Sequence, residues 1–222
     1  MSTDRRSFLE RITLGTVGLG ALDALAPLPL PAAAFAQAEW DLSWTSKVTG
    51  QRKAVYDVPE IESGYGVWRA IGARQQYVKV LKIPQAQVTM VLVLRHNAIC
   101  LAMSQAFWDK YKIGPDNNVT DPLSGQPTTH NPVAERTGAF ALASPHEDKA
   151  LEPFMASGGI VLGCAIAFDD MVEKVKAADK VDSAEAQRRA KTFLVPGVIL
   201  QPSGVFAAQL AQDSGCRYVR AS

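Results

Sequence analysis

The sequence contains little cysteine, little histidine and almost no net charge. Of its 222 residues, 3 are Cys and 3 are His, and 23 basic residues balance 22 acidic ones to a formal net charge of +1. Such a balance produces no broad electrostatic field, so we expect no nucleic-acid partner. The odd set of Cys100, Cys164 and Cys216 is unlike the dense, even-numbered framework of a disulfide-stapled domain. It leaves at least one thiol unpaired in a monomer.

The sequence also lacks the patterns of several enzyme classes. It contains no phosphate-binding loop, no dinucleotide fingerprint, no Ser-His-Asp spacing and no double Cys-x-x-Cys. Its composition is 47% apolar and 20% charged, which is ordinary for a globular protein and argues against disorder.

The amino-terminal segment is typical of a twin-arginine export signal. Arg5 and Arg6 follow polar residues and precede one spacer and two apolar residues. A moderately apolar stretch follows, and an alanine-rich segment at 32–38 suits a signal peptidase. We therefore expect residues 1–38 to be a cleaved signal peptide, and residues 39–222 to form a single periplasmic domain.

The alternative for this segment is a retained membrane anchor. An anchor needs about 20 consecutive apolar residues to cross the hydrocarbon core. Asp23 and the prolines at 27, 29 and 31 interrupt the run, so we favour cleavage. No later segment is apolar enough to span a membrane, and we expect no stable span after cleavage.

Strand and helix patterns alternate along the mature chain. Short apolar or β-branched runs predict strands at 53–58, 87–94, 160–164, 197–202 and 216–220. Apolar residues at helical spacing, with capping residues and glycines, predict helices at 66–82, 97–111, 151–157, 169–178, 183–194 and from 203 or 204 to 212. This order predicts a three-layer α/β/α fold with a five-stranded, mostly parallel sheet. Turn-forming residues predict a long loop at about 112–145.

Candidate site residues follow from this fold, because ligands bind outside the carboxyl ends of parallel strands. Three segments arrive there, after the second, third and fourth strands. They supply Cys164 and His96 as candidate catalytic residues, and Arg95, Asn97, Ser203 and Gly204 as candidate ligand-binding residues.

Cys164 is the most specific of these candidates. A thiol at a strand end that faces a helix amino terminus lies in partial positive charge, which favours the nucleophilic thiolate. The pattern leaves two helix onsets open, directly after Cys164 or at 168–170. The alternative is a small buried side chain with no chemical role.

A metal or haem site through His96 is a weaker hypothesis. His96 and Cys100 are spaced i, i+4, so on an α-helix they would share one face. With His130 or His146 they would offer ligands that suit zinc or copper. A structural histidine is the simpler interpretation, and we predict no cofactor and no metal ligand.

The carboxyl-terminal half resembles the DsrE/DsrF-like family. The resemblance rests on the segments Ile160-Val-Leu-Gly-Cys164, Phe193-Leu-Val-Pro-Gly-Val-Ile-Leu-Gln-Pro-Ser-Gly-Val205 and Leu210-Ala-Gln-Asp-Ser-Gly-Cys-Arg-Tyr-Val219. It extends more loosely back to residue 53. It implies a flavodoxin-like or Rossmann-like, DsrEFH-like fold, and several family members are oligomers.

The resemblance also implies a function. Some family members carry sulfur as a persulfide on the cysteine that Cys164 matches, while others have no established activity. We therefore expect a periplasmic sulfur-carrier or thiol-chemistry protein acting through Cys164, with a small thiol or sulfur donor as partner and a homo-oligomeric state. The alternative is a non-catalytic small-ligand-binding or assembly module.

Overall fold

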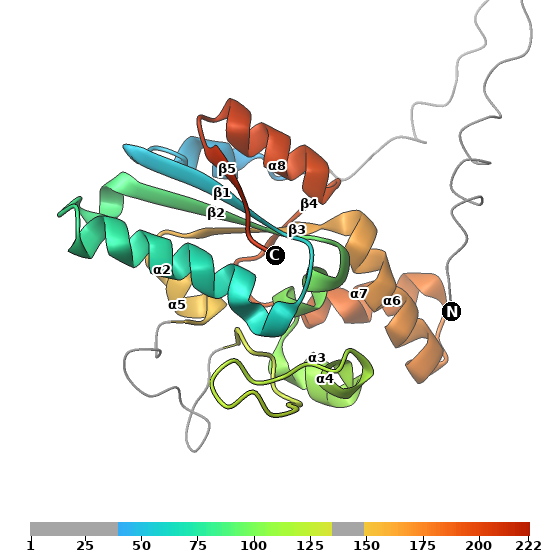
Figure 1. Cartoon of the computed structure of the whole chain (residues 1–222). Helices are drawn as coiled ribbons and strands as arrows, with labels where there is room; N and C mark the ends of the chain where they lie inside the picture. The colour runs from blue at the N-terminus through green and yellow to red at the C-terminus, as the bar shows by residue number, and fades with distance from the viewer. Residues whose placement is uncertain (1–39, 135–148) are drawn as a thin grey trace, which may run out of the picture. The chain divides into compact units, whose positions relative to one another are not determined.

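A computed structural model describes residues 40–134 and 149–222 (Figure 1). The predicted signal peptide at 1–38, with Arg5 and Arg6, lies outside the described residues. So do His146 and the part of the predicted loop from 135 to 145. Residues 40–222 form one compact unit. Within the described ranges, none of the helices combines the length and the apolar character that a membrane crossing requires.

The described residues contain five strands in one parallel sheet, which confirms the predicted fold class. The strand order is β4-β3-β2-β1-β5, and every neighbouring pair is parallel. The strands are β1 (Arg52–Val58), β2 (Val88–Leu94), β3 (Ile160–Cys164), β4 (Ile199–Gln201) and β5 (Arg217–Arg220). Each lies within or close to a strand that the sequence predicts, although β4 is shorter than the predicted 197–202. β2 and β3 are buried along their whole length, as their continuous apolar runs predict.

Helices connect the strands and cover both faces of the sheet (Figure 1). The described helices are η2 (Ser43–Lys47), η3 (Glu62–Gly64), α2 (Tyr65–Lys79), η4 (Gln85–Gln87), η5 (His96–Ala102), α3 (Gln105–Lys110), α4 (Ile113–Asp116), α5 (Leu151–Ala156), α6 (Ala165–Asp179), α7 (Ser183–Thr192) and α8 (Gly204–Asp213). The chain from 112 to 134 is otherwise mostly irregular, as predicted.

Two apolar cores lie on the two faces of the sheet. On one face, α2, α5, α6 and α7 pack against alternate residues of the strands, such as Met90, Leu92 and Leu94 of β2. On the other face, α8 and Trp44 of η2 pack against Val91 and Val93. Successive strand residues point to opposite faces, so β2 is buried along its whole length.

One predicted helix is wrong. The sequence predicts an α-helix from Asn97 to about Tyr111, whereas the chain forms the 3₁₀ helix η5, then an extended residue Met103, and only then α3. The side-chain amide of Asn131 donates to the carbonyls of Leu101 and Met103 at 3.0 and 2.8 Å. These carbonyls are therefore taken by a distant side chain rather than by the next helical turn.

The order of the connections creates a switch point between β3 and β4. The links after β1, β2 and β3 carry α2, α5 and α6 on one face, whereas the link after β4 carries α8 on the other. The carboxyl ends of β3 and β4 are neighbours, because Cys164 is the register partner of Gln201. Open α/β sheets bind their ligands at such a point.

Candidate functional site

Cys164 lies at this switch point. It is the last residue of β3 and the amino-terminal cap of α6, which begins at Ala165. Of the two helix onsets that the sequence left open, the structure has the first. The 15-residue helix therefore directs its free backbone N–H groups and partial positive charge toward residue 164. The cysteine is 7% exposed.

Arg95 follows β2 and forms a two-pronged ion pair with Asp57 of β1. The guanidinium Nε lies 2.7 Å from Oδ1 of Asp57, and Nη2 lies 2.8 Å from Oδ2. The hydroxyl of Tyr218, on β5, donates to the same Oδ2 at 2.6 Å. Asp57 is 3% exposed, so this carboxylate is held almost entirely inside the protein.

Arg95 and Asp57 each stabilise the charged form of the other at this edge of the sheet. Burial opposes ionisation of Asp57, but hydrogen bonds from Arg95 and Tyr218 outweigh it and lower the pKa of the carboxyl. The hydrogen bond to Asp57 raises the pKa of Arg95, and Cys164 adds a smaller electrostatic contribution. Cys164 thus lies within electrostatic reach of a permanently charged guanidinium.

His96 and Asn97 both contact Glu60. Nδ1 of His96 lies 3.2 Å from Oε1 of Glu60, and Nδ2 of Asn97 donates to Oε2 at 2.8 Å. The His96 side chain is 63% exposed, and its backbone adopts a left-handed φ of 50°. No hydrogen bond between His96 and Cys164 is found within the described chain, so the acid–base partnership between these two residues stays a prediction.

Ser203 and Gly204 have clear structural roles at the start of α8. The Ser203 side chain accepts a hydrogen bond from the Phe206 backbone N–H at 3.1 Å and so caps the helix. A side chain at position 204 would collide with Arg95, since its Cβ would lie 2.5 Å from the Arg95 Cβ. Gly204 therefore permits the close approach of Arg95 to α8.

All three cysteines are buried and free, and Cys164 belongs to the apolar core on the face of α2 and α6. Cys100 is 2% exposed and its thiol donates to the Asn97 carbonyl at 3.1 Å. Burial raises the pKa of Cys100 to about 12 and that of Cys216 to about 11. Neither cysteine is in a disulfide. Both fit the interpretation as small buried hydrophobes.

The predicted sharing of one helix face by His96 and Cys100 is wrong. Both residues belong to the 3₁₀ helix η5, in which residues three apart, not four, align. His96 is exposed whereas Cys100 is buried. Among the described residues, no group of three or more His, Cys, Asp or Glu side chains could hold a metal ion.

The structure therefore separates the predicted site residues into two groups. Cys164, Arg95 and Gly204 come together where β2, β3 and α8 meet, whereas His96 and Asn97 face Glu60. Sequence reasoning missed Asp57 and Tyr218. A carboxylate inside the apolar run of β1, directly before Val58 and Pro59, was the signal that could have revealed Asp57.

Comparison with known proteins identifies no relative of this chain. No family model, no curated protein and no solved structure matches the chain.

Proposed function

We propose that the protein is an exported DsrE-like sulfur carrier that holds a persulfide on Cys164. The observation that supports this most directly is the place of Cys164, which occupies the N-cap position of α6 at the switch point of the sheet and lies within electrostatic reach of Arg95. Helix termini and nearby cations both stabilise a thiolate. The same surroundings would stabilise the terminal sulfur anion of a persulfide.

The chemistry requires only one nucleophilic step. The Cys164 thiolate attacks the outer sulfur of a donor persulfide, R–S–SH. A bond forms between Sγ and that sulfur, the donor S–S bond breaks, and the donor leaves as the thiolate R–S⁻. The product is Cys164–S–SH, and no external oxidant or reductant is needed.

Mass spectrometry of the mature protein tests the proposal. After incubation with glutathione persulfide, we expect one added sulfur, about 32 Da, reversed by dithiothreitol and located on Cys164. The variant Cys164→Ser should take up none. Cys100→Ser and Cys216→Ser are matched controls that should load like the wild type, because burial raises the pKa of both thiols. The proposal fails if the wild type stays unmodified, or if Cys164→Ser loads as fully as the wild type.

A second candidate function is a binding or assembly module at the same edge. Three apolar side chains beside the switch point are exposed: Ile166 in the first turn of α6, and Val205 and Phe206 in the first turn of α8. Exposed apolar surface is a feature of protein contacts, and these side chains lie at the starts of the helices that follow the neighbouring strands β3 and β4. A second copy of this chain, or a protein that delivers sulfur, would cover them.

The two candidates differ in what Ile166→Ser changes. Under the assembly function this variant should reduce self-association in sedimentation experiments while loading of Cys164 by the small donor stays normal. Lys176→Ser on the same helix, far from its first turn, is the control. An unchanged sedimentation profile would remove self-association through this surface as the function.

Periplasmic location is part of the proposal and has its own test. Replacing both Arg5 and Arg6 by Lys in the full-length chain should abolish export through the twin-arginine route. The expected result is full-length protein in the cytoplasmic fraction, against a shorter periplasmic form for the wild type. Periplasmic protein from the double variant would contradict a twin-arginine route.

A further inference from the structure

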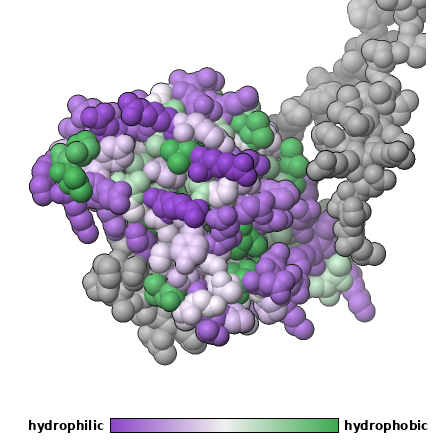
Figure 2. Space-filling model, in the orientation of Figure 1, coloured by the Kyte–Doolittle hydropathy of each residue, from purple (hydrophilic) through white to green (hydrophobic). Residues whose placement is uncertain are grey.

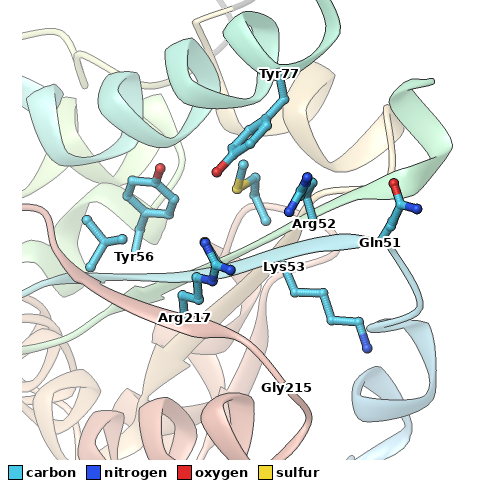
Figure 3. Close-up of a pocket in the computed structure, with 10 residues that line it drawn as sticks. Gln51, Arg52, Lys53, Tyr56, Tyr77, Gly215 and Arg217 are labelled. Carbon is cyan, nitrogen blue, oxygen red and sulfur yellow. The ribbon is translucent and has the colours of Figure 1, made fainter. Parts of the chain in front are cut away.

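The amino end of the sheet carries a cationic cavity, at the opposite end of the strands from Cys164. It has a volume of about 260 Å³. Its wall is formed by the first residues of β1, by α2 and by the edge strand β5 (Figure 3). The lining residues are Gln51, Arg52, Lys53, Ala54, Tyr56, Tyr77, Met90, Gly215, Arg217 and Val219.

Two guanidinium groups share this cavity without a carboxylate. Arg52 and Arg217 both line it, and no lining residue is acidic. Within the described residues neither guanidinium group forms an ion pair or a hydrogen bond, unlike that of Arg95. An anion placed in the cavity would therefore meet two cations and no competing carboxylate.

Two tyrosine hydroxyls face the same space. In Figure 3 the Tyr77 hydroxyl points from α2 toward the centre of the cavity, where the Arg217 side chain rises from β5 and Tyr56 lies beside it. Tyr56 is only 7% exposed, and its hydroxyl has no hydrogen-bond partner among the described residues. Burial, and then the proximity of Tyr77, raise the pKa of Tyr56, so this phenol remains a hydrogen-bond donor at neutral pH.

The floor of the cavity is apolar. Ala54, Met90 and Val219 line it between the two strands and α2. Lys53 lines it as well, but its amino group points away in Figure 3 and donates to the Ser214 carbonyl at 3.4 Å. The cavity therefore combines two forked cations and two hydroxyl donors at the rim with an apolar base.

We propose that this cavity binds a small organic oxyanion, a carboxylate or a phosphate monoester with a compact apolar body. Guanidinium groups match the two oxygens of a carboxylate or phosphate in a forked geometry, and the hydroxyls supply further donors. Ala54 and Met90 would contact the apolar body. This inference concerns the other end of the sheet and does not rest on sulfur chemistry at Cys164.

Calorimetric titration with four probes tests the proposal. Benzoate and phenyl phosphate carry the predicted anion on an apolar ring, inorganic phosphate lacks the ring, and benzamide lacks the charge. We expect the first two to bind with a Kd of about 1 mM, as suits ligands of about ten heavy atoms. Inorganic phosphate and benzamide should each bind at least about tenfold more weakly. The tighter of the first two decides between carboxylate and phosphate ester.

Variants in one strand provide the matched comparison. Arg217→Gln should weaken binding about tenfold, the effect of losing a hydrogen bond to a charged group. Arg220→Gln removes the same charge from β5, but Arg220 does not line the cavity. It should change the affinity less than twofold. Tyr77→Phe keeps the ring and removes the hydroxyl, and should weaken binding about threefold to tenfold.

Several results would overturn the proposal. These are an absence of binding by both anionic ring probes at 10 mM, equal binding of benzamide and benzoate, and equal affinities of the Arg217→Gln and Arg220→Gln variants. If inorganic phosphate binds as tightly as phenyl phosphate, the cavity does not select an apolar body and is only a nonspecific cationic patch. If no probe binds and Arg217→Gln changes the sedimentation coefficient, this surface is an interface between copies. Circular dichroism establishes that each variant is folded, and Arg52→Gln replaces Arg217→Gln if that variant is not.

Discussion

The two ends of the sheet use the same residue types in opposite ways. At the carboxyl end, Nε and Nη2 of Arg95 bind Asp57, and the Tyr218 hydroxyl donates to the same carboxylate. At the amino end, Arg52 and Arg217 share a cavity with two tyrosines, and no acidic residue lines it. A cation with a buried partner positions neighbouring groups, whereas a cation without one is available to a ligand.

The short edge strand β5 contributes to both ends. Tyr218 points to the face of α8, where it meets Asp57, whereas Arg217 and Val219 line the cavity on the face of α2. Because side chains alternate along β5, this strand of four residues contacts the Arg95–Asp57 ion pair on one face and the cationic cavity on the other.

Figure 2 shows a largely hydrophilic face, on which apolar residues form small, separate spots rather than one continuous area.

The reactivity of the three thiols gives the largest expected effect: Cys164 ends β3 and Cys100 follows β2 at the carboxyl end, and Cys216 precedes β5 at the amino end. In folded protein at pH 8, Cys100 and Cys216 should react with iodoacetamide at least about a hundredfold more slowly than in the urea-unfolded chain. The reason is that burial raises their pKa values to about 12 and 11, which leaves almost no thiolate. Peptide mapping should find Cys164 alkylated first. If Cys216 reacts as fast as Cys164, the proposal that Cys164 is the reactive thiol is wrong.

The Arg95–Asp57 pair gives the next largest effect. Asp57→Asn keeps the shape of the side chain but leaves Arg95 without its counter-charge, and should lower the free energy of unfolding at pH 7 by about 2 kcal/mol. The pKa of Asp57 is lowered in the folded state. Its stabilisation is therefore fully present above the ordinary pKa of about 4 and is lost as the pH falls through the folded value.

Urea titrations of both proteins across pH measure this effect. The difference between wild type and Asp57→Asn should be constant from pH 7 to about 5 and shrink below pH 4. Asp170→Asn, an exposed carboxylate on α6, is the control and should change stability by less than about 0.5 kcal/mol. A difference that grows as the pH falls would mean that Asp57 is not stabilised as a carboxylate.

Local patterns predicted most of the fold. The strands at 53–58 and 160–164 are short, apolar and bounded by turn residues, so their sequence and their environment agree. The helix at 97–111 could not be predicted correctly, because hydrogen bonds from Asn131, about thirty positions further along the chain, decide how it breaks. The spacing of apolar residues within a short stretch of sequence contains no information about a hydrogen-bond partner so far along the chain.

The candidate sites show the same limit. The position of Cys164 at a strand end followed from pattern and topology, and the immediate onset of α6 was one of two options left open. The partner of Arg95 did not follow, because the pairing of β1 with β2 sets which carboxylate it meets. The amino-end cavity depends on Arg52 and Arg217, which only the β1–β5 pairing brings together.

Gly204 tests how closely Arg95 is held against α8. Gly204→Ala places a Cβ 2.5 Å from the Arg95 Cβ, which must force the strand end and the helix apart. We expect a loss of about 2 kcal/mol in urea unfolding, as for overpacked cores. Gly72→Ala is the matched control inside α2, where the nearest atom is the Lys149 amino group at 3.7 Å. It should be neutral or stabilising by up to about 1 kcal/mol, and equal losses in both variants would refute a specific contact with Arg95.

The smallest effect concerns Ser203, which the sequence marks as a ligand contact and the structure uses as a helix cap. Ser203→Ala should cost about 1 kcal/mol of unfolding free energy, as should Asp182→Ala, whose side chain accepts from the Glu185 N–H at 2.9 Å in α7. If capping is the whole role of Ser203, persulfide loading of Cys164 stays normal in both variants. If loading falls in Ser203→Ala alone while the two stabilities match, the hydroxyl also contacts the species bound at the carboxyl end. That outcome would make Ser203 part of the site, beside Cys164 and Arg95.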